Sequence, residues 1–302
     1  MITIMGPTAT GKTQLAADIA DRTGGEIISA DSRQVYRGMD IGTGKDLDDY
    51  VVEGRTIHHH LIDIVEPGYE YNVYEFQKDF MAAYEDIITR GKVPVMCGGT
   101  GMYIESVLKG YKLIKVPRNQ VLRRELSEKT DNELQELLRA MKDNLHNTTD
   151  LTNRERMIRA IEIQDYYENH PVRENDFPEV ESVLVGIHFE RPELRRRITK
   201  RLHHRLNNGM VEEVQHLLNT QVAPEDLRFY GLEYRYLTDY LTGKLEYETM
   251  VQQLNTAIHQ FAKRQVTWFR RMERNGHKIH WIDGNLSREE KRDEAMKVIE
   301  GK

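Results

Sequence analysis

The sequence predicts an α/β fold in which a parallel β-sheet is flanked by helices and interrupted by an all-helical insertion. Short apolar runs alternate with amphipathic stretches in the first third of the 302-residue chain, which is typical of parallel strands joined by crossover helices. Residues 117–167 are charged and helical in pattern, and strand character returns at residues 182–189. We therefore expect residues 1–115 and 180–302 to form the core, and residues 116–179 to form the helical insertion.

The individual elements follow from their periodicity. Apolar runs bounded by turn residues predict strands at residues 2–5, 26–29, 60–65, 93–97, 182–189 and 278–282. Apolar residues at helical spacing predict helices at residues 14–21, 73–90, 193–207, 211–219 and 245–275.

Composition limits the classes of function. The formal net charge is -6, whereas proteins that coat nucleic acid are usually basic, so any RNA contact must come from local basic patches. The single cysteine, Cys97, excludes an internal disulfide and a cysteine zinc cluster, and favours a reducing compartment. The sequence shows no signal peptide and no apolar stretch near the ~20 residues that span a bilayer. We expect a cytoplasmic monomer with no membrane contact.

A phosphate-binding motif follows the first predicted strand and opens a helix. It consists of Gly6, Pro7, Thr8, Ala9, Thr10, Gly11, Lys12 and Thr13, and it fits the P-loop pattern of P-loop NTPase-like folds. The backbone N–H groups and the helix N-terminus favour phosphate, Lys12 adds a positive charge, and the Thr13 hydroxyl can bind Mg²⁺. The usual ligand of such a loop is ATP or GTP. No base-reading motif of GTPases follows, and a nucleotide kinase stays open because residues 60–63 resemble a Walker B strand end.

Asp31 follows the second predicted strand. The carboxyl ends of parallel strands line the ligand crevice, so Asp31 is expected beside the phosphate loop. A carboxylate there would repel phosphate unless it had another task. A helix N-cap and an outer ligand of Mg²⁺ are the structural alternatives.

Seven motifs in order resemble the tRNA dimethylallyltransferase family: GPTATGKT, ISADSRQVYRGMDIGTGK, HHLIDIVEP, GGTGMYIESVLKG, RERMIRAIE, LRFYGLEYRYL and AKRQVTWFRRM. The resemblance runs from residue 1 to about residue 282. It implies transfer of a dimethylallyl group from dimethylallyl diphosphate to the amino nitrogen of the adenosine 3′ of the anticodon in tRNA, which gives N6-isopentenyladenosine. The same family contains enzymes that prenylate free AMP, ADP or ATP, and this alternative stays open.

The resemblance also implies roles for particular residues. The P-loop would hold the diphosphate, with Mg²⁺ at Thr13. Asp31 matches the catalytic base, Thr100 a threonine near the reacting centre, and Arg228 an arginine that reaches the diphosphate. A helix N-cap at Thr100 and a surface ion pair at Arg228 are the structural alternatives. Lys45 matches another lysine near the site.

The matches that imply RNA contact lie in two segments. Asp31, Ser32, Arg33 and Gln34 match the segment that contacts the target nucleoside, and the tRNA-contacting positions of the insertion correspond to Arg123, Glu155, Arg156, Met157, Ile158 and Arg159. A solvated helix face is the alternative for the arginines. Two basic runs, residues 191–205 and 263–274, add positive charge for RNA, while ordinary burial preference places Trp268 and Phe269 in the core.

A few positions depart from the family pattern. Arg33 stands where methionine is usual, Gly44 where alanine is common, and residues 231–234 differ from the more common G-Y-K/R-E. These differences concern recognition of the acceptor and leave the phosphate chemistry intact. Residues 58–60 are three histidines, but adjacent strand residues alternate between faces, so we expect no metal there.

Overall fold

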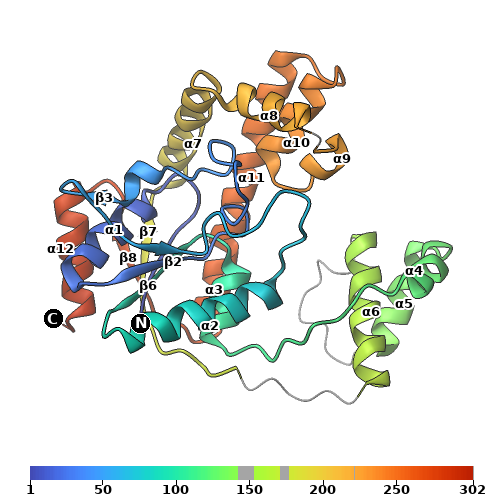
Figure 1. Cartoon of the computed structure of the whole chain (residues 1–302), viewed down its shortest axis with the longest axis horizontal. Coiled ribbons are helices and arrows are strands. Elements are labelled where there is room, and N and C mark those ends of the chain that lie inside the picture. The colour runs from blue at the N-terminus through green and yellow to red at the C-terminus, as the bar shows by residue number, and fades with distance from the viewer. Residues whose placement is uncertain (142–152, 171–176, 221, 302) are drawn as a thin grey trace. The chain divides into compact units, whose positions relative to one another are not determined.

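The computed structural model describes residues 1–141, 153–170, 177–220 and 222–301 (Figure 1). The chain divides into two compact units, one formed by residues 1–110 and 178–302 and the other by residues 111–177. Within the described residues, no helix combines the length and apolar character that crossing a membrane requires.

The first unit is built on a parallel sheet, as the sequence predicts. Six strands of the described chain lie in the order β5-β2-β6-β1-β7-β8, and every neighbouring pair runs parallel. Their bounds are β1 Ile2–Met5, β2 Glu26–Ser29, β5 His59–His60, β6 Pro94–Gly98, β7 Val183–His188 and β8 Ile279–Asp283. The four residues of β1 and of β2 are all buried, which is expected for strands covered by helices on both faces. The carboxyl ends of β1, β2 and β6 meet at one edge of this sheet.

The predicted strand at residues 60–65 is wrong in extent. Only His59 and His60 pair with β2, because Leu61 and Asp63 have φ angles of 62° and 53° and turn the chain out of the sheet. Val65 then returns to form one isolated parallel bridge with Tyr36. A separate hairpin, β3 Val51–Val52 and β4 Arg55–Thr56, also lies outside the main sheet.

Helices cover both faces of the sheet (Figure 1). On one face α1 packs against α12, and on the other α2 packs against α3, with α11 beside α3. These helices are α1 Lys12–Thr23, α2 Val73–Thr89, α3 Gly101–Leu108, α11 Tyr247–Arg274 and α12 Arg288–Ile299. A capping box of Asn72 and Glu75 fixes the start of α2.

A group of helices lies between β7 and β8 in the chain. It consists of α7 Arg191–Leu206, α8 Met210–Asn219, the short α9 Pro224–Leu227 and α10 Leu232–Leu241. α10 contacts α8, α9 and α11, and α7 contacts α8 and α11. The sequence predicts α7, α8 and α11 to within a few residues, whereas α3, α9, α10 and α12 were not assigned from it.

The second unit consists of helices in its described residues. These are α4 Gln120–Ser127, α5 Asp131–Met141 and α6 Arg154–Asn169. Leu126, Leu134, Leu138, Met157 and Ile161, which are all at least 99% buried, form its apolar core. This unit therefore buries a small core of its own.

Candidate active site

The P-loop joins β1 to α1 in a tightly packed turn. A β-carbon at Gly6 would lie 2.9 Å from Thr10 Oγ1 and 3.2 Å from the carbonyl oxygen of Ile187, so any larger residue would push the loop against β7. Ala9 and Gly11 adopt φ angles of 66° and 81°, which curl the loop at the N-terminus of α1. Burial lowers the pKa of Lys12, because its ammonium has little water to stabilise it before an anion binds.

Side chains of α7 and α11 hold this loop in place. Arg197 Nε donates to the carbonyl oxygen of Ala9 at 2.9 Å, and Arg201 donates to the hydroxyl of Thr8. Gln265 accepts from Thr8 N and donates to the carbonyl oxygen of Gly99, both at 2.9 Å. Sequence reasoning assigned the basic run at residues 191–205 to RNA and missed this contact. The four-residue spacing of Arg197 and Arg201 indicates that both lie on one helix face, but it does not identify the P-loop as their partner.

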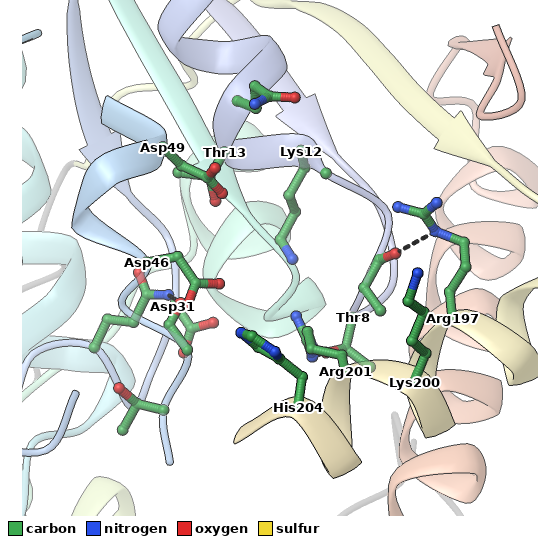
Figure 2. Close-up of a pocket in the computed structure, with 16 residues that line it drawn as sticks. Thr8, Lys12, Thr13, Asp31, Asp46, Asp49, Arg197, Lys200, Arg201 and His204 are labelled. Carbon is green, nitrogen blue, oxygen red and sulfur yellow. Dashed lines mark hydrogen bonds between the residues drawn. The ribbon is translucent and has the colours of Figure 1, made fainter. Parts of the chain in front are cut away.

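A cavity of about 460 Å³ opens over the P-loop. Figure 2 shows Lys12 reaching into it, with Asp31, Asp46 and Asp49 on one side and Arg201, Lys200, Arg197 and His204 on the other. One wall is thus cationic and the opposite wall is acidic. Burial raises the pKa of Asp49 and lowers that of Arg201 to about 10, because neither charge is fully solvated there.

A second cavity of about 330 Å³ meets the first. The residues that line both are Thr8, Lys12, Asp31, Thr43 and Arg201. The second cavity is also lined by Thr100, Arg228, residues 229–233 and Arg235. Asp31 therefore stands at the junction of a phosphate-binding space and a separate space that is large enough for part of a second substrate.

The position of Asp31 is set by the close approach of β2 and β6. A β-carbon at Gly98 would lie 2.2 Å from the carbonyl oxygen of Ala30, and Ala30 N donates to the carbonyl oxygen of Cys97 at 2.7 Å. Asp31 Oδ1 accepts from Arg33 N at 2.9 Å, which makes an Asx-turn. No helix starts at Asp31, so the N-cap alternative does not apply.

Thr100 is the N-cap residue of α3, but its side chain makes no capping bond. Its hydroxyl instead accepts from Ser32 N at 3.2 Å. The hydroxyl therefore ties the end of β6 to the segment that follows Asp31. The structure brings the predicted catalytic pair Asp31 and Thr100 together in the second cavity.

Arg228 lies in the same cavity and pairs with Asp239 through Nη2. Its Nε atom is buried and has no hydrogen-bond partner among the described residues. The ion pair of the structural alternative is therefore present, and the buried Nε is a polar atom whose hydrogen-bonding capacity is not satisfied by the described residues.

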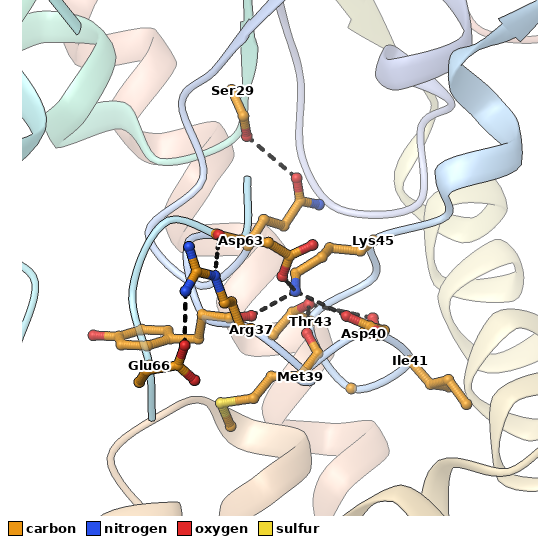
Figure 3. A network of polar contacts seen from close by, with 12 residues as sticks. Ser29, Arg37, Met39, Asp40, Ile41, Thr43, Lys45, Asp63 and Glu66 are labelled. Atoms are coloured by element: carbon orange, nitrogen blue, oxygen red, sulfur yellow. Dashed lines mark hydrogen bonds and ion pairs between the residues drawn. The ribbon is translucent and has the colours of Figure 1, made fainter. Parts of the chain in front are cut away.

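Lys45 lines neither of these two cavities and instead stabilises the loop that follows β2. Its side chain is fully buried, and Nζ donates to the carbonyl oxygen of Tyr36 at 2.5 Å, to Asp40 at 2.8 Å and to Asp63 (Figure 3). Gln34 acts in a similar way, because its side-chain amide donates to the carbonyl oxygen of Gly44 at 3.0 Å. Both side chains fix the backbone around the segment that begins at Asp31.

In the helical unit, two of the predicted RNA-contacting arginines share one carboxylate. Arg123 and Arg159 both bond Glu162, whose side chain is 2% exposed. Burial alone would raise the pKa of Glu162, but these hydrogen bonds outweigh it and lower the pKa to about 2. Met157 is 1% exposed in the core, with Ile158 packed against it, whereas Glu155 and Arg156 are exposed. On this part of α6, the polar side chains are therefore the ones that a partner can contact.

Two of the three adjacent histidines do share a face. His58 and His60 lie near Glu26, with ligand atoms of all three within 4.8 Å. Glu26, however, is already bonded by Arg90 and by Lys92. These permanent cations occupy the carboxylate and oppose a further positive charge.

Comparison with known proteins agrees with this geometry. The IPP transferase family model matches residues 34–272, and an isopentenyl transferase model matches residues 1–63. The chain is 57% identical to tRNA dimethylallyltransferase 2 of Bacteroides fragilis, covering 96% of this chain and 95% of that protein. It is 56% identical to tRNA dimethylallyltransferase 1 of Parabacteroides distasonis, covering 99% and 97%.

Solved structures show the same likeness. The tRNA isopentenylpyrophosphate transferase of Bacillus halodurans is 30% identical with a TM-score of 0.71, covering 99% of this chain and 95% of that one. A eukaryotic dimethylallyltransferase acting on tRNA is 25% identical with a TM-score of 0.75, covering 94% and 73%. From the extent of the family model and these identities, the chain belongs to the IPP transferase family.

Proposed function

We propose that this protein transfers a dimethylallyl group from dimethylallyl diphosphate to the N6 atom of the adenosine 3′ of the anticodon in tRNA. The observation that carries the proposal is the place of Asp31, at the junction of the P-loop cavity and the second cavity. A carboxylate beside a phosphate site is unfavourable unless it acts on another group. The relatives named tRNA dimethylallyltransferase support this choice of donor and acceptor.

The diphosphate of the donor fits the P-loop cavity. Thr8, Ala9, Gly11, Lys12 and Thr13 line it, Gly6, Pro7 and Thr10 complete the loop, and Arg197, Lys200 and Arg201 add positive charge from α7. Thr13 and Asp49 both line the cavity with oxygen ligands, which is the donor set that Mg²⁺ prefers. When bound, Mg²⁺ would neutralise charge on the diphosphate. Each well-placed donor to the leaving group is worth ~3–4 kcal/mol in the transition state.

The reaction proposed for the junction is a substitution at carbon. The N6 atom of adenine forms a bond to C1 of the dimethylallyl group, while the bond from C1 to the diphosphate oxygen breaks. The nitrogen then carries excess positive charge and passes one proton to the carboxylate of Asp31. Such general base catalysis contributes typically ~10²–10⁴-fold. Thr100 and Arg228 share the second cavity, where we place them next to the reacting groups.

The acceptor contacts are proposed in two places. Ser32, Arg33 and Gln34 follow the base and form the edge of the nucleoside site, with Gln34 acting mainly through the loop it fixes. In the helical unit, Arg123, Glu155, Arg156 and Arg159 would meet the tRNA, and Met157 and Ile158 would support that helix from its core side. We further propose that the enzyme acts as a monomer in the cytoplasm, where its acceptor is found.

The test offers labelled dimethylallyl diphosphate to the purified protein with an anticodon stem-loop, with AMP, or with ATP and no prenyl donor. We expect label in the stem-loop and none in AMP. The variant Asp31→Asn should bind the donor normally and lose at least ~10²-fold in kcat. The variant Asp48→Asn is the matched control, because Asp48 is exposed and lines neither of the two cavities.

Three outcomes would contradict the proposal in different ways. Label in AMP but not in the stem-loop would move the acceptor to free nucleotides. Phosphoryl transfer from ATP without use of the prenyl donor would make the protein a kinase. A rate near that of the wild type in Asp31→Asn would remove the carboxylate from the chemistry.

A further inference from the structure

Two large aromatic side chains are exposed at the second cavity. Phe229, in the turn after α9, is 50% exposed, and Phe261, on α11, is 38% exposed. Both line this cavity, the one that also contains Asp31. Phenylalanine is usually buried, so two exposed rings at the mouth of one site indicate a surface that is covered in a complex.

An arginine side chain lies over each of the two rings. The guanidinium of Arg33 lies 5.2 Å from the centre of the Phe229 ring, and that of Arg264 lies 5.9 Å from the centre of the Phe261 ring. Among the described residues that line the cavity, Arg33, Lys12, Arg201, Arg205, Arg228, Arg235 and Arg264 are cationic, and Asp31 and Glu233 are acidic. The cavity mouth therefore combines flat apolar faces with an excess of positive charge.

Phe229 is held in position by its neighbour. Its ring meets Tyr230 edge-on at 5.8 Å, and Tyr230 meets the buried ring of Tyr36 at 4.6 Å. The hydroxyl of Tyr230 also accepts from Gly68 N. The exposed ring thus rests on the fixed pair of Tyr230 and Tyr36, of which Tyr36 belongs to the same loop as Arg33, and this reduces the entropy lost when a ligand stacks on the ring.

Aromatic faces next to guanidinium groups are the chemistry that binds single-stranded nucleic acid, because every base has a flat face and every nucleotide a phosphate. An isolated AMP carries one base, which must enter the cavity to reach Asp31, and it would leave both outer rings uncovered. The unpaired loop nucleotides on either side of the target adenosine have the bases and phosphates that fit.

We propose that Phe229 and Phe261 are stacking platforms for the bases that flank the target adenosine, and that Arg33 and Arg264 pair with the adjoining phosphates. This inference rests on the proposed function. The platforms hold the neighbouring bases apart from the target base and so help to keep it unstacked inside the cavity, which otherwise costs a few kcal/mol. They select an RNA loop over a free nucleotide.

The test compares Phe229→Leu and Phe261→Leu with Tyr247→Leu. Tyr247 lies on the same helix as Phe261, is 36% exposed and does not line the cavity, so it is a matched control. We expect each phenylalanine variant to raise the KM for the anticodon stem-loop by roughly 5- to 100-fold, the range of base stacking on an aromatic ring. The KM for dimethylallyl diphosphate should stay unchanged, and Phe229→Trp should restore stem-loop binding.

Salt dependence separates stacking from charge. The variant Arg264→Gln should reduce the slope of log KM against log salt by about one phosphate contact, whereas Phe261→Leu should leave the slope unchanged. A stem-loop KM within about twofold of wild type in both phenylalanine variants would overturn the inference. So would equal losses for the stem-loop and the donor. If the wild-type protein itself transfers no dimethylallyl group, the proposed function fails first, and stem-loop binding by gel shift still tests the platforms.

Discussion

Replacing Gly98 by alanine should impair the reaction without removing any polar group. The added β-carbon would lie 2.2 Å from the carbonyl oxygen of Ala30, well inside the 3.0 Å that real β-carbons respect. Relief requires the ends of β2 and β6 to separate by about 1 Å, at a cost of ~1–3 kcal/mol in stability. Asp31 is the next residue along the chain, so it moves with Ala30. A displacement of about 1 Å in a catalytic group lowers the rate by ~10²-fold.

The other end of the same two strands supplies the control. A β-carbon at Gly25 would lie 2.4 Å from the carbonyl oxygen of Val93, so Gly25→Ala strains the pair in the same way but far along the strands from Asp31. Thermal unfolding should show comparable losses of stability in both variants. Steady-state transfer to a stem-loop should show a loss of kcat in Gly98→Ala alone. Equal kcat in the two variants, measured well below both melting temperatures, would refute this account of how Asp31 is positioned.

Other predictions test the remaining parts of the molecule. Arg201→Met should raise the KM for the donor by ~10- to 100-fold through loss of a charged hydrogen bond, while Arg196→Met, whose side chain is 78% exposed on the same helix, should not. Inorganic diphosphate should raise the melting temperature of the wild type more than that of Arg201→Met. The pKa of Glu162 is lowered from 4.5 to about 2, so the carboxylate stabilises the helical unit by at most ~3 kcal/mol above pH 4.5. This stabilisation is lost as pH falls from 4.5 toward 2. Pepsin cleavage in the helical unit should therefore accelerate over that pH range, and much less so in Glu162→Gln. Burial raises the pKa of Cys97 to about 12, so its thiol should react with a disulfide reagent at pH 8 only after unfolding; rapid reaction of the native protein would contradict its burial.

Much of the fold could be predicted because strongly apolar runs and helical periodicity report burial directly. β1, β2, β6, β7 and β8 all match predicted runs. The run at residues 60–65 misled because its apolar side chains pack in a loop, and the positive φ angles of Leu61 and Asp63 leave no mark on the hydrophobic pattern. α10 went unassigned, although Tyr234 and Leu237 are fully buried in it, because the partly buried Tyr236 and Tyr240 obscure the helical spacing of its core residues.

The candidate site divides in the same way. Local motifs placed the P-loop, Asp31 and Thr100, since each lies at the end of a strand and the strand order brings them together. Gln265 and the face of α7 were not predicted as parts of the phosphate site, because they reach the P-loop from distant parts of the sequence. A sequence separation of 257 residues between Thr8 and Gln265 cannot be read from spacing. Only the packing of α7 and α11 around the P-loop reveals that their side chains belong to the phosphate site.

The proposed reaction requires two opposite charges within one crevice, and the fold supplies them from separate elements. A diphosphate needs positive charge, while removal of a proton from adenine needs a carboxylate that the phosphate does not displace. Figure 2 shows how the conflict is met: most of the cations stand on one helix, α7, with Lys12 at the start of α1, and the carboxylates stand in the segment that follows β2. We expect the diphosphate to be drawn to the α7 wall, while Asp31 also lines the second cavity. Because the chain carries 43 basic and 49 acidic residues, this separation, and not the overall charge, must account for anion binding.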